Sequence, residues 1–119
     1  MEAARLQDYI AGYDRRRAAR MAARQQLAAR ARAAVPAIAQ LCRAYGARRV
    51  RLFGSLVTGL LGTDPDIDLA VEGVPPQRFF ELWGRIATLQ PAGVEVDLVD
   101  LARCTAALRR AIEQQGVDV

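Results

Sequence analysis

The chain has 119 residues and a net charge of +4, and this length suits one compact domain rather than two. Hydrophobic residues make up 52% of it, but 23 of them are Ala and aromatic residues make up only 6%, so we expect a small, helix-rich core. Neither Lys nor His occurs. Their absence excludes P-loop and Schiff-base chemistry, His-dependent catalytic triads and zinc sites with His ligands.

The cysteines and the apolar runs indicate the environment of the protein. Cys42 and Cys104 are far apart and form no CxxC motif, so we expect two free thiols and no disulfide scaffold. No apolar run approaches the roughly 20 residues that span a bilayer, and the Arg-studded N-terminus has no apolar core of a signal peptide. We therefore expect a cytoplasmic protein that does not engage a membrane.

The N-terminal segment differs from the rest in charge and composition. Residues 1–32 carry eight Arg against three acidic residues, whereas residues 33–119 have a net charge of −1. Ala, Arg, Gln and Leu dominate residues 2–34, which predicts a long helix. Its larger apolar side chains form one thin stripe: Leu6, Ile10, Tyr13, Met21 and Leu27. We expect residues 1–34 to be a helical arm that packs on a partner chain or folds back along a domain of residues 35–119.

Short strands and helices alternate in the remainder. Pro36 can open a second helix over residues 37–45 or kink the first one, and Gly46 is a helix stop. Alternating apolar residues and turn residues then predict an ordered series of elements: a strand over 48–54, a short helix over 55–61 closed by Gly62, a strand over 66–71, a helix over 77–89, a strand over 94–99 and a helix over 101–115 with Leu108 and Ile112 inward. This order predicts an α+β fold.

Gly54 and Ser55 stand where the first strand meets the short helix. Backbone N–H groups at a helix N-terminus attract anions, and the Ser hydroxyl adds a further hydrogen-bonding group, so the pair can cradle a phosphate. Gly59, one helical turn on, leaves the face beside Ser55 open for a ligand or for close packing. A tight turn that only needs Gly would give the same pattern.

Acidic residues follow on the next two strands. Asp66 and Asp68 are two apart, so both carboxylates project from one face while Ile67 and Leu69 enter the core. Such a pair is retained most easily where a divalent cation or a shared proton relieves the repulsion, and magnesium is the natural cation. A solvated strand face balanced by Arg is the alternative.

The third strand adds Glu95 and Asp97 on one face. If the second and third strands are neighbours, Asp97 comes beside Asp66 and Asp68. Three carboxylates next to a phosphate-binding turn would make a two-metal phosphoryl-transfer site. Taken alone, Asp97 could equally be a charge on an edge strand.

These residues together resemble the nucleotidyltransferase superfamily that includes DNA polymerase beta, and within it the minimal nucleotidyltransferase (MNT) domains. The resemblance lies in LFGSLVTGLLGTDPDIDLAVEG and VEVDLVDL, and the closing ALRRAIEQQGV is similar to the C-terminal helix of MNT antitoxins. It spans roughly residues 36–119 and implies the nucleotidyltransferase fold, with a small mixed sheet of three or more strands flanked by helices. Many relatives have Arg where this chain has Leu56 and Ser where it has Pro65.

The resemblance also implies roles for the candidate residues. Gly54 and Ser55 would contact the nucleotide phosphates, with Gly59 beside them. The three aspartates would hold two magnesium ions, and Asp97 would in addition activate the incoming hydroxyl: Asp66, Asp68 and Asp97. The substrate would be ATP, and AMP would pass to a hydroxyl of a protein partner. MNT proteins of this size are commonly antitoxins that modify a HEPN ribonuclease toxin in this way.

Several alternatives stay open at the level of sequence. The domain could neutralise its partner by binding alone, with the carboxylates unused, or it could modify a small molecule. The Arg-rich arm could be a solvated helix face, a docking surface for a homo- or hetero-oligomer, or a nucleic-acid contact. Nucleic acid is the less favoured partner, because no aromatic residues are interleaved with the Arg residues for base stacking.

Overall fold

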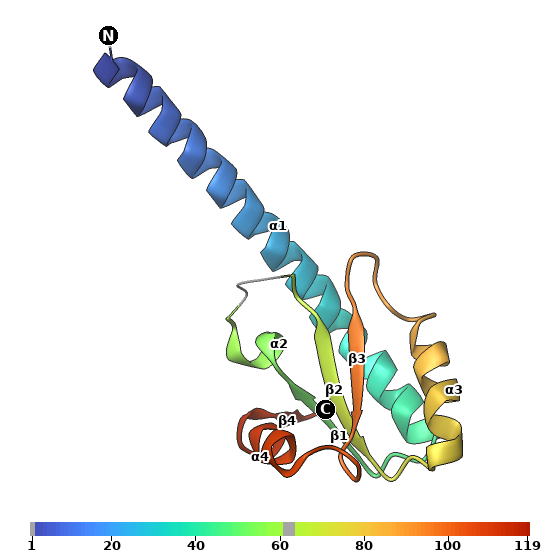
Figure 1. Cartoon of the computed structure of the whole chain (residues 1–119). Helices are drawn as coiled ribbons and strands as arrows, with labels where there is room; N and C mark the ends of the chain where they lie inside the picture. Colours follow the sequence, from blue (N-terminus) through green and yellow to red (C-terminus); the bar gives the residue numbers. More distant parts are fainter. Residues whose placement is uncertain (1, 61–63) are drawn as a thin grey trace.

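One helix, α1 (Glu2–Ala44), takes up more than a third of the chain in the computed structural model, which describes residues 2–60 and 64–119 (Figure 1). The sequence predicted a second helix or a kink at Pro36, but α1 passes this residue without a break. Pro36 removes one backbone hydrogen bond of the helix. Val35 and Ile38, on either side of it, are buried against the sheet, so packing offsets that loss.

A mixed sheet forms the centre of the domain. It contains β1 (Arg49–Phe53), β2 (Ile67–Glu72), β3 (Val96–Asp100) and β4 (Val117–Asp118), in the order β3-β2-β1-β4. β1 runs antiparallel to β2 and to β4, whereas β2 and β3 are parallel. The predicted mixed sheet is confirmed, and the two-residue strand β4 is an addition to the prediction.

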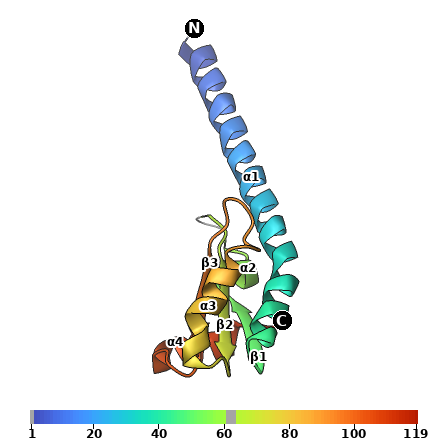
Figure 2. The same cartoon turned by 90° about the vertical axis from the view of Figure 1, so that its right-hand side faces the viewer.

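Helices cover both faces of the sheet unequally. α1 and α3 (Pro76–Ile86) pack on the face that carries the larger core, to which β2 contributes Ile67, Leu69 and Val71. α4 (Ala106–Gln115) packs on the other face through Ile112, which meets Ala70. Figure 2 shows α1 and α4 on opposite sides of the sheet. Residues of β2 with even numbers therefore face the side that α4 covers only in part.

The short helix after β1 ends earlier than predicted. α2 (Ser55–Thr58) stops because Gly59 adopts a left-handed conformation, with φ 75°, and its N–H binds the carbonyl of Ser55. Leu61 and Gly62, which the sequence predicted at the end of this helix, lie outside the described residues.

The closing helix starts later than predicted. It begins at Ala106 rather than at Leu101, because the Thr105 hydroxyl accepts a hydrogen bond from the Leu108 N–H at 3.2 Å and caps the helix. This start places Leu108 on the surface, with 36% of it exposed, so its predicted inward position is wrong. Ile112 is buried as predicted.

Arg51 fastens the C-terminal segment to the sheet. It lies in β1 with only 8% of its surface exposed, and its guanidinium meets the Asp118 carboxylate at 2.9 Å. The same guanidinium donates to the backbone carbonyls of Ile112, Glu113 and Gly116. A buried guanidinium needs such a full set of acceptors, and this set holds α4 and β4 in place.

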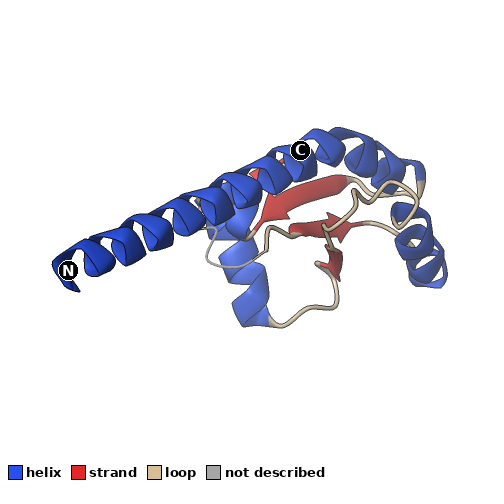
Figure 3. Ribbon diagram, turned by 90° about the horizontal axis from the view of Figure 1, so that it is seen from above, coloured by secondary structure: helices blue, strands red, loops and turns tan. Residues whose placement is uncertain are grey.

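The N-terminal part of α1 projects beyond the domain (Figure 3). Burial of α1 against the domain starts at Ala28 and extends to Cys42. The molecule measures 68 × 30 × 19 Å, and its longest dimension matches a helix of 43 residues at about 1.5 Å per residue. No helix among the described residues has the length and apolar content needed to cross a membrane. Cys42 and Cys104 are free thiols, as predicted.

Candidate active site

The sheet register brings two predicted site residues side by side. Asp68 in β2 and Asp97 in β3 are direct partners in the parallel pairing. Their neighbours Ile67, Leu69, Val96 and Leu98 are buried in the core on the opposite face, so both carboxylates project from the face away from α1. Asp66 precedes β2 by one residue and completes the predicted group of three.

Gly54 ties the predicted phosphate turn to this acidic group. It has φ 76° and ψ −152°, a conformation that side chains rarely adopt. A Cβ at this position would collide with Asp68 Oδ2 and would lie 3.1 Å from Asp68 Cγ. Gly54 is therefore required twice, by its backbone conformation and by the carboxylate packed against it.

The first turn of α2 opens toward this carboxylate. The N–H groups of Val57 and Thr58 bind the Gly54 carbonyl at 3.1 Å, which leaves the N–H groups of Ser55 and Leu56 outside the helical hydrogen-bond ladder. Among the residues that the structure describes, no side chain caps the helix N-terminus at Gly54. Leu56 is buried in the core and fixes the helix, so the free N–H groups and the Ser55 hydroxyl are held at one place.

Gly59 ends α2 and lies in open space. Among the described residues, no atom comes within 4 Å of the position that a Cβ on Gly59 would take. The sequence predicted a face that is open either for a ligand or for close packing. The described residues leave this face open and do not pack closely on it.

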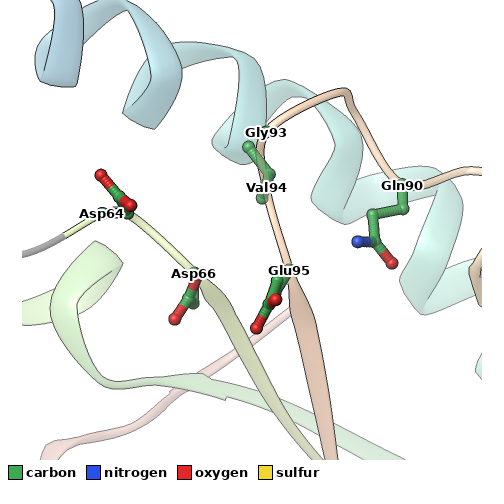
Figure 4. Close-up of a pocket in the computed structure, with 6 residues that line it drawn as sticks. All are labelled: Asp64, Asp66, Gln90, Gly93, Val94 and Glu95. Carbon is green, nitrogen blue, oxygen red and sulfur yellow. The ribbon is translucent and has the colours of Figure 1, made fainter.

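A cavity of about 550 Å³ adjoins the acidic group. Six residues of the described ranges line it: Asp64, Asp66, Gln90, Gly93, Val94 and Glu95. Figure 4 shows the carboxylates of Asp66 and Glu95 on neighbouring strands, pointing to the same side, and the Ile67 N–H binds the Glu95 carbonyl at 2.9 Å. The cavity is thus acidic and opens at the end of the sheet where Asp66 stands.

The sequence did not assign a function to the other cavity residues. Asp64 lies in the loop before β2, and Gln90 lies in the loop after α3. Glu95 was recognised on the face of Asp97, but only the parallel register places it next to Asp66. Asp64 falls inside the motif LFGSLVTGLLGTDPDIDLAVEG without an assigned role, and Gln90 lies outside both motifs.

Electrostatics distinguish Asp68 from the other carboxylates. Burial, the charges of Asp97 and Asp66, and a hydrogen bond with Asp97 raise the pKa of Asp68 from 3.8 to about 6. A proton held between Asp68 and Asp97 relieves the repulsion of two adjacent carboxylates. In the described part of the chain, no group of three acidic or cysteine side chains is already in position to hold a metal ion. The carboxylates of Asp66, Asp68 and Asp97 would therefore have to rotate toward a bound ion.

Comparison with known proteins decides the family. The sequence profile described as "Nucleotidyltransferase domain" matches residues 37–118. The chain belongs to the nucleotidyltransferase domain family. The match includes every candidate site residue and the end of α1 from residue 37 onward, and it confirms the prediction of a nucleotidyltransferase.

Solved structures resemble this nucleotidyltransferase in fold and sequence. A protein described as a minimal nucleotidyltransferase is 31% identical, with a TM-score of 0.60 over 74% of this chain and 91% of that chain. A chain of a toxin–antitoxin complex with AMP-PNP is 29% identical, with a TM-score of 0.56 over 68% of each chain. A chain of the complex between the tri-AMPylated Shewanella oneidensis HEPN toxin and the MNT antitoxin is 26% identical, with a TM-score of 0.55 over 73% of this chain and 69% of that chain. No protein with curated annotation matches this one.

Proposed function

We propose that this nucleotidyltransferase moves AMP from ATP to a hydroxyl group of a partner protein and depends on magnesium. The observation that carries the proposal is the position of Asp68, which is paired with Asp97 and packed against Gly54. One carboxylate thereby joins the acidic group to the turn that opens α2. Phosphoryl transfer needs this combination, since negative charge on the phosphates must be held and neutralised at one place.

The acidic residues suit a divalent cation by their chemistry. Carboxylate oxygens are the ligands that magnesium prefers, and the charges of Asp97 and Asp66 both raise the pKa of Asp68, so a cation would relieve the repulsion within the group. We infer that Asp66, Asp68 and Asp97 would hold the metal, with two ions expected. When bound, magnesium would neutralise charge on the phosphates and on the attacking hydroxyl.

The chain's own groups would position the nucleotide. The N–H groups at the start of α2 and the Ser55 hydroxyl would bind phosphate oxygens, and the open face at Gly59 leaves room beside them. The hydroxyl oxygen of the partner would form a bond to the α-phosphorus of ATP. The bond between this phosphorus and the oxygen that bridges it to the β-phosphorus would break. Pyrophosphate would leave, and Asp97 would accept the hydroxyl proton.

We propose a HEPN toxin as the partner, which would make this chain the MNT antitoxin of a toxin–antitoxin pair. The support is the similarity to the Shewanella oneidensis antitoxin, whose HEPN toxin partner carries three AMP groups, and to the toxin–antitoxin complex with AMP-PNP. The acidic cavity next to Asp66 lies open at the end of the sheet, so a side chain of another protein could enter it.

The test uses ATP labelled in either the α- or the γ-phosphate. Each form is incubated with the purified chain, magnesium and the protein encoded by the reading frame adjacent to its gene. We expect label from the α-phosphate on that protein and no label from the γ-phosphate, which leaves in pyrophosphate. The Asp68→Asn variant is the matched control, and it should transfer nothing while it stays folded.

Two outcomes would contradict this proposal. Transfer of γ-label would show phosphorylation instead of nucleotidyl transfer. A stable complex without any label would show that the chain acts on its partner by binding alone.

A further inference from the structure

The free part of α1 presents an apolar stripe to solvent. Its largest members all lie in the first half of the helix, and between 46% and 66% of each is exposed: Leu6, Tyr9, Ile10, Tyr13 and Met21. Steps of three or four residues lead back from the buried Ala28 through Arg24, Met21 and Arg17 to this stripe. The stripe therefore continues the side of α1 that packs on the domain, but here no part of the described domain covers it.

Charge is distributed unequally along the same segment. Residues 2–14 hold three acidic residues and one Arg, a net charge of −2, whereas residues 15–32 hold seven Arg and no acid. Two such helices side by side in parallel would place like charges together. In the antiparallel orientation the acidic tip of one helix lies along the basic part of the other.

We propose that the arm, residues 2–26, pairs antiparallel with the arm of a second copy of this chain. Pairing over this free length is centred near Tyr13 and Asp14. It brings Glu2 and Asp8 of one arm level with the segment that carries Arg20 and Arg24 in the other. The apolar stripes then face each other across the centre, and each covers the exposed side chains of its counterpart.

The overlap between two antiparallel arms would end where α1 reaches the domain. Leu27 Cδ2 lies 3.4 Å from the position that a Cβ on Gly93 would take, and Gly93 lines the acidic cavity. The tip of each arm would therefore stop beside the cavity loop of the other copy. The domain itself limits how far two antiparallel arms can overlap.

The first test is the molar mass of the full chain, measured by light scattering at tens of micromolar. We expect a dimer, and we expect the double variant Ile10→Glu with Tyr13→Glu to be a monomer, since it places four charges in the contact. Phe80→Glu is the matched control, because Phe80 is a 79% exposed aromatic residue outside the arm. This control should remain a dimer.

The second test determines orientation by cross-linking in a Cys104→Ser background, which leaves the buried Cys42 as the native thiol. Ala3→Cys and Gln25→Cys are made in separate chains and oxidised alone or mixed. We expect a disulfide-linked dimer only in the mixture. Cross-linking of Ala3→Cys with itself would show parallel arms and overturn the proposal. A monomeric full chain would also overturn it, including one that uses the arm to bind RNA or a different protein.

Discussion

Gly54 affects both the backbone conformation and the acidic group of the candidate site. Its positive φ turns the chain from β1 into α2, and the absence of a side chain lets Asp68 pack against it. A substitution here should therefore affect the site more than the fold.

We predict that Gly54→Ala lowers the rate of AMP transfer by about 100-fold or more, because the added methyl displaces the Asp68 carboxylate and misplacement of a reacting group by about 1 Å has effects of this size. Gly46→Ala is the matched control, since Gly46 also has a positive φ, of 110°, but lies at the start of the loop before β1, away from the acidic group. The control should cost about 1 kcal/mol of stability and leave transfer unchanged. Equal losses of transfer in both variants would contradict this assignment.

We predict that the ionised Asp68 carboxylate lowers the free energy of unfolding of the metal-free protein. Its pKa is raised from 3.8 to about 6, so the folded state holds the proton more tightly than the unfolded chain does. The free energy of unfolding should therefore fall as the pH rises from about 4 to about 6 and stay lowered above that. Two pKa units correspond to about 3 kcal/mol, and partial exposure of this carboxylate reduces the expected effect to about 1–2 kcal/mol.

The variant Asp68→Asn tests this sign. In EDTA at pH 7, we expect its free energy of unfolding to exceed that of the native chain by about 1–2 kcal/mol, with the difference largely gone at pH 4. Denaturant titrations at the two pH values give both numbers. A variant that is less stable than the native chain at pH 7 would show that the Asp68 charge is compensated in the fold.

Among the elements, α1 contacts α2, the short helix whose first turn we propose to bind phosphate. Arg32 Nη2 donates to the carbonyl of Leu56 in α2 at 3.4 Å. The last carbonyls of a helix have no partner within it, and a cation there is favourable. Arg32 therefore acts as a positioning residue, which holds α2, and with it Ser55, at the site.

We expect Arg32→Ala to raise the KM for ATP several-fold and to change kcat little, because α2 loses one anchor while the carboxylates stay in place. Arg32→Lys should restore part of the affinity. Arg30→Ala serves as the control, since Arg30 is also exposed on α1 and has the same charge. Steady-state kinetics distinguish the variants, and an equal rise in KM for Arg30→Ala would point to general charge rather than to the contact with Leu56.

The elements also show what sequence alone can predict. The strands that carry Asp68 and Asp97 were predicted because apolar and acidic residues alternate in both, and the alternation also gave the correct buried side. β4 was missed because two residues have no periodicity, and its place depends on pairing with β1 and on Arg51. The start of α4 was misplaced although Thr105 carried a capping signal. The acidic cavity depends on loops and register, which local patterns do not encode.

In the whole molecule, α1 consists of a segment that packs in the domain core and a segment that projects from it. Its segment from Ala28 onward contributes to the core, and its N-terminal segment is free. The predicted boundary between residues 1–34 and 35–119 is not resolved by this packing and stays a prediction. Two truncations would locate it.

Removal of residues 1–22 should leave the free energy of unfolding within about 1 kcal/mol of the full chain and retain ATP binding, because the described residues that are lost are exposed apart from Gly12, which lies beside the Arg15 and Arg16 side chains of the same helix. Removal of residues 1–34 should destabilise the domain by several kcal/mol, since Ala28 and Ala31 are fully buried in the core. Thermal unfolding of the two truncated chains checks this. Equal stability of both would place the boundary at residue 34 and show that the Ala28 contact is dispensable.

The proposed function requires that Asp66, Asp68 and Asp97 bind a nucleotide through a divalent cation beside Gly54. Calorimetric titration with ATP, in magnesium and in EDTA, tests it most directly. We predict binding in magnesium, loss of at least about tenfold in affinity in EDTA, and the same loss for Asp68→Asn in magnesium, because uncompensated carboxylates repel the triphosphate. Equal affinity with and without the metal would show that these carboxylates do not bind the nucleotide through a cation.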